Sequence, residues 1–298
     1  TEVDTYQFDP PIDSSDMSPL QWSQLVRVIS DNYDEYDGFV VLHGTDTMAF
    51  TASALSFMLE NLTKPVVLTG SQVPIGQLRT DGKENLITSI EIASAKHADG
   101  SPMVPEVCIY FSGRLLRGNR STKVNADGFN AFDSFNYPHL ADAGINIVYH
   151  EEYIRKPDYT KPMIPHFDLD PNVVIFTLFP GIQDNIVQHA LDVPELRAIV
   201  MRSYGSGNAP QRPCLMNMLR DAASRGVNIV NISQCAEGTV EMGRYDTGYQ
   251  LKNARVISGY DSTVESAVAK LMFLLGQYRD PEIVREKMEQ NLRGEISL

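Results

Sequence analysis

A repeated order of short apolar runs, polar loops and helical segments constrains the fold of the first half of the chain most strongly. Each apolar run is four or five residues long and ends in a polar or glycine-containing loop. This order is typical of β-α-β units, which form a parallel sheet. The sequence predicts strands over Gly38–Leu42, Pro65–Thr69 and Val107–Phe111, with helices over Thr47–Leu62 and Asp81–Ala95.

The same alternation returns in the second half, after a segment of different character. Residues 153–171 contain four prolines and mixed charges without a hydrophobic period, which is typical of a linker. The prediction is therefore an α/β protein with two domains and mainly parallel sheets, at 1–152 and 172–298. The second domain is smaller and Rossmann-like, with expected strands over Val173–Leu178, Ala198–Arg202 and Val227–Ile232 and expected helices over Asp184–Leu191, Pro213–Arg225, Thr263–Tyr278 and Pro281–Gln290.

Composition excludes several classes of protein. The 25 Lys and Arg residues against 38 Asp and Glu give a net charge of −13, which disfavours a nucleic-acid partner. No apolar run reaches 18 residues, so we expect no membrane span. The three cysteines do not form a C-x-x-C pattern, and the six histidines have no metal-ligand spacing. We therefore expect a reducing compartment and no metal site.

Two polar loops are candidates for ligand binding, although each also suits a helix cap. Thr45 and Asp46 follow the strand 38–42, and ligands of parallel sheets bind at the carboxyl ends of strands. Thr and Asp are also common N-cap residues. The run 13–16 (D-S-S-D) either caps the helix after Pro19 or forms an anion-binding loop after an expected strand at Val3–Phe8.

Two further loops carry charge or glycine. In R-G-N-R-S-T-K (117–123) we expect the arginines to be solvated. If Lys123 lies beside a Thr/Asp pair, its ammonium lowers the effective pKa of a hydroxyl there, or, if it is desolvated, the lysine acts as the base itself. The glycine-rich run 203–208 lacks the lysine and spacing of a phosphate loop, so nucleotide binding is not expected.

Taken together and in order, the motifs of this chain resemble those of the asparaginase/glutaminase family, and most closely the type I branch of bacterial L-asparaginases. The resemblance covers nearly the whole chain. It is carried by D-S-S-D-M at 13–17, D-G-F-V-V-L-H-G-T-D-T-M-A at 37–49, K-P-V-V-L-T-G-S-Q at 64–72, R-G-N-R-S-T-K at 117–123, S-Y-G-S-G-N-A-P-Q at 203–211 and N-L-R-G-E at 291–295.

The resemblance implies an amidohydrolase that converts L-asparagine to L-aspartate and ammonia through a threonine acyl-enzyme, without a cofactor. Thr45, Asp46 and Lys123 then form one catalytic cluster. Asp46 also binds the α-amino group of the substrate, and the loop 13–15 binds its α-carboxylate. The expected substrate-binding residues are Asp13, Ser14, Ser15, Thr45, Asp46 and Ser71.

The resemblance also implies an assembly and a location. Members of the family form homotetramers, as dimers of dimers, with each active site between two subunits. Asn208 is the expected contact with a neighbouring subunit's site. Type I relatives are cytoplasmic, and some carry a regulatory asparagine site, for which Thr122 and Arg202 are the candidates here.

One family motif is not in these 298 residues: the T-G-G-T-I segment, which holds the nucleophilic threonine. We expect this segment to lie upstream of residue 1. Three alternatives are an amino-acid-binding homologue without catalysis, an N-terminal nucleophile at Thr1 and a tRNA-dependent amidotransferase subunit. The net charge of −13 argues against the last of these.

Overall fold

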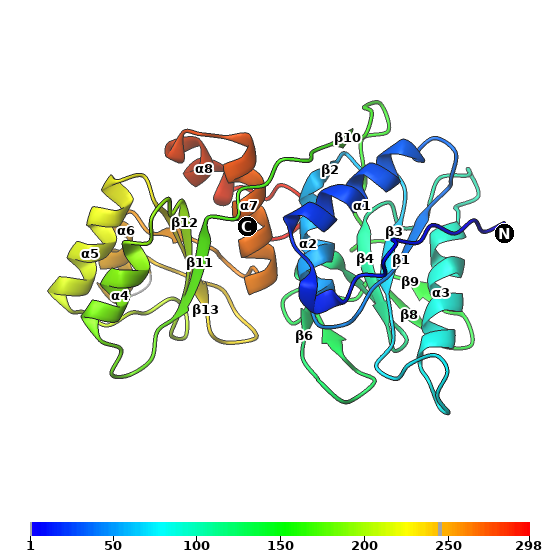
Figure 1. The fold of residues 1–298 in the computed structure, drawn as a ribbon, viewed down its shortest axis with the longest axis horizontal. Coiled ribbons are helices and arrows are strands. Elements are labelled where there is room, and N and C mark those ends of the chain that lie inside the picture. The colour runs from blue at the N-terminus through cyan, green and yellow to red at the C-terminus, as the bar shows by residue number, and fades with distance from the viewer. Residues whose placement is uncertain (1, 244–245) are drawn as a thin grey trace. The chain divides into compact units, whose positions relative to one another are not determined.

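The computed structural model describes residues 2–243 and 246–298. The chain forms two compact units, Thr1–Phe167 and Asp168–Leu298 (Figure 1). The division falls inside the proline-containing segment 153–171. Part of that segment is nevertheless ordered into the first unit, since β10 (Ile164–Pro165) pairs with β2 (Leu59–Glu60).

The N-terminal unit is built on a six-stranded mixed sheet with the order β1-β3-β4-β5-β8-β9. Only half of this sheet is parallel, whereas the sequence predicts a mainly parallel one. The parallel strands are β1 (Phe39–Leu42), β3 (Val66–Thr69) and β4 (Val107–Phe111), and the antiparallel ones are β5 (Arg114–Arg117), β8 (Ala141–Ala143) and β9 (Ile147–Tyr149).

A two-residue turn explains the change of direction after β4. Ser112 and Gly113 join β4 to β5 and have φ angles of 50° and 80°. Two consecutive residues with positive φ are typical of a tight hairpin turn, which returns the chain antiparallel to the preceding strand. A parallel return needs a crossover of a dozen or more residues, and none is present here.

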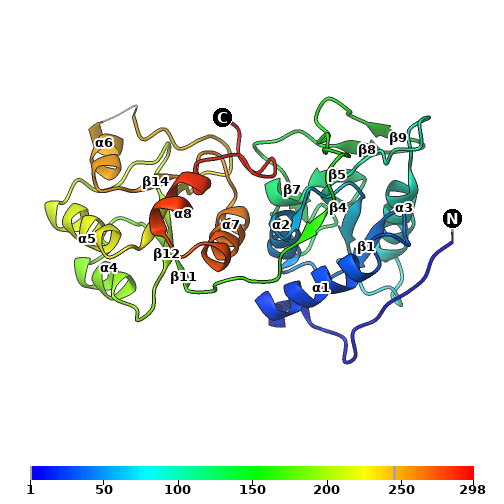
Figure 2. The ribbon, with the colours of Figure 1, turned by 90° about the horizontal axis from the view of Figure 1, so that it is seen from above.

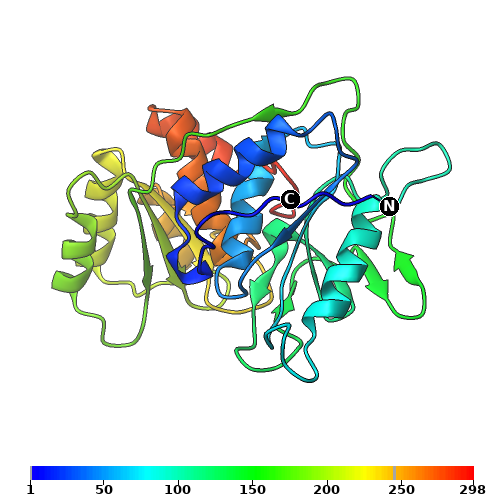
Figure 3. The same ribbon diagram turned by 45° about the vertical axis from the view of Figure 1, so that its right-hand side comes forward.

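Helices cover both faces of this sheet. Helix α3 (Gly82–Ser94) packs on one face against β1 and β3, and α2 (Met48–Met58) packs on the other against β4 (Figures 2 and 3). Helix α1 (Pro19–Asp31) lies on α2. Its start is fixed by a capping box between Ser18 and Gln21, with Pro19 in the first turn.

Several short elements complete the N-terminal unit, and one expected strand is missing from it. The short elements are η1 (Ser14–Asp16), η2 (Gly118–Arg120), β6 (Thr122–Lys123) and its antiparallel partner β7 (Phe132–Asp133). The expectation of a strand at Val3–Phe8 is wrong: this segment is extended and mostly exposed, and it pairs with no strand among the described residues. Without a neighbouring strand, its backbone groups face solvent instead of a ladder.

The C-terminal unit has the parallel sheet that the sequence predicts. Its strands are β11 (Val173–Thr177), β12 (Ala198–Ser203), β13 (Asn228–Ser233) and β14 (Ile257–Ser258), in that order. One face carries α4 (Asp184–Leu191), α5 (Pro213–Ser224) and α6 (Asp246–Asn253), and the other carries α7 (Val264–Gln277) and α8 (Pro281–Met288) (Figure 1). No helix in residues 2–243 and 246–298 combines the length and apolar character that crossing a bilayer demands.

A buried ion pair fastens the end of the chain to this unit. Lys270 on α7 contacts Glu295 at 2.6 Å, and their side chains are only 2% and 0% exposed. Lys270 also donates to the carbonyl oxygens of Met288 (3.0 Å) and Gln290 (2.5 Å). Glu295 accepts from two backbone N–H groups of its own turn. Burying a charged group without partners is costly, and here both charged groups have hydrogen-bond partners.

Candidate active site

The loop between β1 and α2 positions the candidate side chains at the carboxyl end of a parallel strand. Its approach to η1 is close, because a Cβ on Gly44 would lie 2.5 Å from the Ser14 Oγ. Thr47, in the same loop as Gly44, donates a hydrogen bond of 2.6 Å to the carbonyl oxygen of Ser14. Gly44 is therefore the residue that lets the two loops touch.

His43 supports this loop from beneath as a neutral imidazole. Its Nδ1 lies 2.6 Å from the Gly44 carbonyl oxygen, and its Nε2 lies 2.9 Å from the Thr51 Oγ1. The Gly44 carbonyl oxygen only accepts, so Nδ1 carries the proton of the neutral ring and Nε2 accepts from Thr51, whose oxygen in turn accepts from Trp22. Burial lowers the pKa of His43, against the hydrogen bond to Gly44. With both nitrogens occupied in this way, the ring braces the loop rather than exchanging protons in the site.

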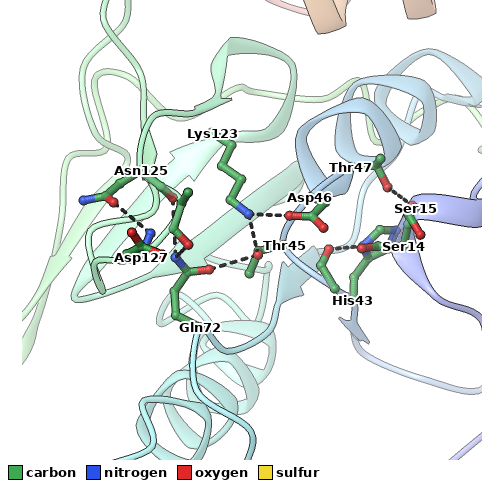
Figure 4. Close-up of polar contacts among 12 residues, drawn as sticks. Ser14, Ser15, His43, Thr45, Asp46, Thr47, Gln72, Lys123, Asn125 and Asp127 are labelled. Atoms are coloured by element: carbon green, nitrogen blue, oxygen red, sulfur yellow. Dashed lines mark hydrogen bonds and ion pairs between the residues drawn. The ribbon is translucent and has the colours of Figure 1, made fainter.

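Thr45, Asp46 and Lys123 come together from two distant parts of the chain (Figure 4). Lys123, on β6, donates to the Thr45 Oγ1 at 2.9 Å and to the Asp46 Oδ1 at 2.6 Å. The Lys123 side chain is 20% exposed and that of Asp46 is 67% exposed. The cluster thus combines a hydroxyl, a carboxylate and an ammonium at a solvent-facing position, which is a set of groups suited to activating an oxygen nucleophile.

Gln72 is a fourth member of the cluster that the sequence reasoning missed. It follows β3, and its Oε1 accepts a hydrogen bond of 2.9 Å from the Thr45 Oγ1. The motif T-G-S-Q offered one signal, since it ends a strand adjacent to β1 and its loop must meet the loop that holds Thr45. A glutamine has no titratable group, which is why a search for acids, bases and nucleophiles passes over it.

The turn 13–15 shows the properties of a cap and lies against the cluster loop. The Asp13 carboxylate accepts from the backbone N–H and from the hydroxyl of Ser15, each at 2.8 Å. The backbone N–H and then the hydroxyl of Ser15 lower the pKa of Asp13. Ser14 is 7% exposed and faces Gly44. The turn 13–15 is therefore held by its own hydrogen bonds, and its serines lie beside the loop of Thr45 and Asp46.

The other predicted site residues lie outside these contacts. Ser71 is half-buried in the loop after β3, next to Gly82. Thr122 is on β6 in the N-terminal unit, whereas Arg202 and Asn208 belong to the C-terminal unit. Asn208 closes a turn by a short antiparallel bridge with Tyr204. Thr1 lies outside the described residues.

The expectation that the arginines of the 117–123 motif are solvated is wrong. Arg117 is 5% exposed and Arg120 is 2% exposed. Arg117 pairs with the buried Glu106 at 2.6 Å and stacks on the Tyr137 ring at 4.2 Å. Burial works against the charge of Arg117, but Glu106 outweighs it and raises the pKa of Arg117. These contacts fix the segment from which Lys123 projects.

No group of three or more His, Cys, Asp or Glu side chains in the described ranges has the arrangement of a metal site. The site residues are instead a hydroxyl–carboxylate–ammonium cluster at the carboxyl edge of an α/β sheet. This combination is typical of α/β proteins that bind small polar ligands in the loops at the carboxyl ends of their strands.

The comparisons place the chain in one family of that class. Residues 2–155 match the model of the asparaginase N-terminal domain, and residues 172–288 match that of the glutaminase/asparaginase C-terminal domain. The chain belongs to the asparaginase family.

Three relatives are similar over nearly the whole chain. L-asparaginase 1 of Escherichia coli is 46% identical over 292 residues, which are 98% of this chain and 84% of that protein. The crystal structure of L-asparaginase I from Vibrio cholerae superposes with a TM-score of 0.90 at 46% identity, covering 98% of this chain and 86% of that one. The thermostable L-asparaginase of Thermococcus kodakarensis gives 0.87 at 36% identity, over 97% and 84%.

Proposed function

We propose that this protein is a type I L-asparaginase that hydrolyses the side-chain amide of L-asparagine to L-aspartate and ammonia. One observation carries the proposal: the Lys123 ammonium contacts both the Thr45 hydroxyl and the Asp46 carboxylate at the carboxyl end of β1. Two relatives that match 98% of the chain are L-asparaginases by name, which supports the same activity. The substrate is then a free amino acid with an amide side chain.

The arrangement offers opposite charges and donors for the two ends of that substrate. Asp46 is largely exposed and has one oxygen on Lys123, while its Oδ2 has no hydrogen-bond partner among the described residues. This oxygen is available to the substrate ammonium. We assign the α-carboxylate to the turn 13–15, where the exposed Ser15 hydroxyl can donate to it once its single proton turns away from Asp13. A residue within a protein chain has neither a free α-ammonium nor a free α-carboxylate, so it cannot make both of these contacts.

The proposed reaction has two halves. A threonine hydroxyl oxygen attacks the side-chain carbonyl carbon, the C–N bond breaks, and ammonia leaves with the proton of that hydroxyl. A water molecule then adds to the acyl ester, which releases aspartate and returns a proton to the threonine. Thr45, with Lys123 as its donor, is placed to accept a hydrogen bond from that water and so to position it.

We assign the first nucleophile to a threonine of a T-G-G-T segment upstream of residue 1, because these 298 residues do not contain that motif. The open side of β1 supports this assignment. Among the described residues β1 pairs only with β3, and Leu42 at its end is 64% exposed. A strand added there would end beside Thr45, since parallel strands present their carboxyl ends at one edge.

The remaining features of the proposal concern assembly and regulation. We assign the protein to the cytoplasm and to a homotetramer in which Asn208 reaches the site of a neighbouring subunit. Thr122 and Arg202 are the candidates for a second, regulatory asparagine site. The support for these assignments is the motif pattern shared with type I relatives.

A second function deserves a direct test because the nucleophile motif is not in this sequence: binding of an amino acid without turnover. An amidotransferase acting on charged tRNA is disfavoured, because the net charge of −13 repels phosphate.

Ammonia release from L-asparagine tests the proposal. The protein that includes its upstream sequence should release ammonia, whereas residues 1–298 alone should not. Thr→Ala in the upstream motif should abolish turnover but leave aspartate binding measurable by calorimetry. Aspartate binding without ammonia release from the longer protein would support the binding function instead. Full turnover by residues 1–298 would place the nucleophile within them, with Thr1 and Thr45 as the first candidates.

A further inference from the structure

The side-chain amide of Gln72 lies between the Thr45 hydroxyl and a backbone loop (Figure 4). Its Oε1 is 2.9 Å from the Thr45 Oγ1. Its Nε2 is 3.1 Å from the carbonyl oxygens of Ala126 and Gly128 and 3.4 Å from that of Asn125. These three residues belong to the loop that joins β6, which carries Lys123, to β7.

The surroundings of Gln72 decide which end of its amide faces Thr45. Carbonyl oxygens only accept hydrogen bonds, so the atom that faces the loop must be the amide nitrogen, which carries two N–H donors. The amide oxygen must then face Thr45. Because that oxygen is also only an acceptor, the Thr45 hydroxyl must donate its single proton to Gln72.

We infer that Gln72 is a positioning residue that fixes the direction of the Thr45 hydroxyl proton. With this proton on Gln72, the lone pairs of the Thr45 oxygen face Lys123 and the open side of the site. Thr45 therefore accepts from a water or a substrate N–H instead of giving up its proton in the resting site. The inference deepens the proposed function and rests on it for its kinetic readout.

The backbone of Gln72 is anchored independently of its side chain. The Asp81 carboxylate accepts from the backbone N–H of Gln72 at 3.0 and 3.1 Å and from that of Val73 at 3.1 Å. Asn85 donates to the same carboxylate at 3.3 Å and to the Gly70 carbonyl oxygen at 3.0 Å. The backbone that carries the Gln72 side chain is thus held in place, and a fixed backbone is the condition for orienting a neighbouring hydroxyl.

Gln72→Glu provides a test that separates orientation from packing. A protonated carboxyl copies the amide: its carbonyl oxygen accepts from Thr45 and its O–H donates to a loop carbonyl. An ionised carboxylate still accepts from Thr45, but it has no donor for the loop and the loop carbonyl oxygens repel its charge, so its acceptor oxygen is no longer held in a fixed position. The ratio of the kcat of this variant to that of the unmodified enzyme should therefore fall by about 10-fold or more between pH 5 and pH 8. KM should change less, because Gln72 touches Thr45 rather than substrate.

Gln72→Leu and Thr80→Val complete the kinetic set. Gln72→Leu removes both contacts at every pH, so its kcat should fall by about 10- to 100-fold with no added pH dependence. Thr80 donates to the Val73 carbonyl oxygen at 2.8 Å in the same loop but does not touch Thr45, so Thr80→Val should keep kcat within about twofold. A flat ratio for Gln72→Glu, or unchanged kcat for Gln72→Leu, would overturn the inference.

Hydrogen exchange gives a readout that needs no turnover. The backbone amides of Asp127 and Gly128 should exchange faster in Gln72→Leu at all pH values, and in Gln72→Glu only once the introduced carboxyl ionises. Unchanged exchange in both variants would contradict the contact that fixes the amide direction. The two proposals thus fail separately: an inactive unmodified protein contradicts the proposed function, and unchanged exchange contradicts the role of Gln72.

Discussion

Replacing Lys270 by methionine should strip the buried Glu295 of its counter-charge. Methionine has nearly the length of lysine and fills the space of its aliphatic stem, so the main loss is the charge and its hydrogen bonds. Three acceptors lose a donor: the Glu295 carboxylate and the carbonyl oxygens of Met288 and Gln290. The side chains of the pair are 2% and 0% exposed, so water does not replace the lost donor.

The expected loss in the free energy of unfolding of the C-terminal unit is about 3–5 kcal/mol, the range for breaking one side of a buried pair. The two N–H groups that Glu295 keeps, from Leu292 and Arg293, favour the lower part of this range. Urea unfolding followed by circular dichroism at pH 7.5 measures it. Lys161→Met is the matched control, because the Lys161–Asp158 pair is 71% and 42% exposed and should contribute less than about 1 kcal/mol.

The effect should also depend on pH with a definite sign. In the unmodified protein burial alone favours a higher pKa, but Lys270 and the backbone donors outweigh it and lower the pKa of Glu295. Its contribution is thus present above the pKa of the unfolded state and is lost as pH falls through the folded value. In Lys270→Met the lysine charge no longer opposes the effect of burial, so the pKa of Glu295 rises. Protonation of Glu295 then removes the unpaired buried charge and stabilises the variant. The difference between the two proteins should shrink from pH 7.5 to pH 5.

Lys270→Met with Glu295→Gln removes both charges and should recover most of the loss, because replacing a buried pair is often nearly neutral. A loss under about 1 kcal/mol in the single variant, or a difference that grows toward pH 5, would refute the reasoning.

Three further predictions concern the site and the assembly. Lys123→Met should lower kcat for ammonia release by at least about 100-fold while the circular dichroism spectrum stays unchanged, and near-normal turnover would remove Lys123 from the mechanism. Gly44→Ala should raise KM for asparagine several-fold, because the new Cβ would lie 2.5 Å from the Ser14 Oγ and push the two loops apart; an unchanged KM would show that the loops do not share the substrate. Light scattering should give a homotetramer, and a fully active monomer would exclude a shared site.

The parallel parts of the fold could be predicted because their signals are local. Apolar runs of four or five residues followed by polar loops place β1, β3 and β4, and the helices between them, within a few residues of their observed bounds. The antiparallel half was missed because its strands are short and its direction is set by one turn, Ser112–Gly113. Nothing in the apolar pattern of β5 separates it from a parallel strand.

The site was predictable where charge or strand-end position marked it, and unpredictable where burial decided the role. Thr45 and Lys123 are 78 residues apart in the chain, and motif order alone suggested that they meet. Arg117 and Arg120 read as solvated because arginines usually are. Glu106, the partner of Arg117, lies on another segment, and only the tertiary fold reveals that pairing. The role of Gln72 could be assigned only from the structure, because it depends on the positions of both Thr45 and the loop carbonyl oxygens.

The contact of Gly44 with Ser14 also limits how this protein can acquire a new specificity. At Gly44 the turn 13–15 and the loop of Thr45 and Asp46 leave no room for a Cβ, and Thr47 links the two by a hydrogen bond to the Ser14 carbonyl oxygen. A directed-evolution library that varies one of these loops alone will meet a steric conflict before it explores new substrates. Productive variants should therefore carry paired substitutions on both sides of the contact.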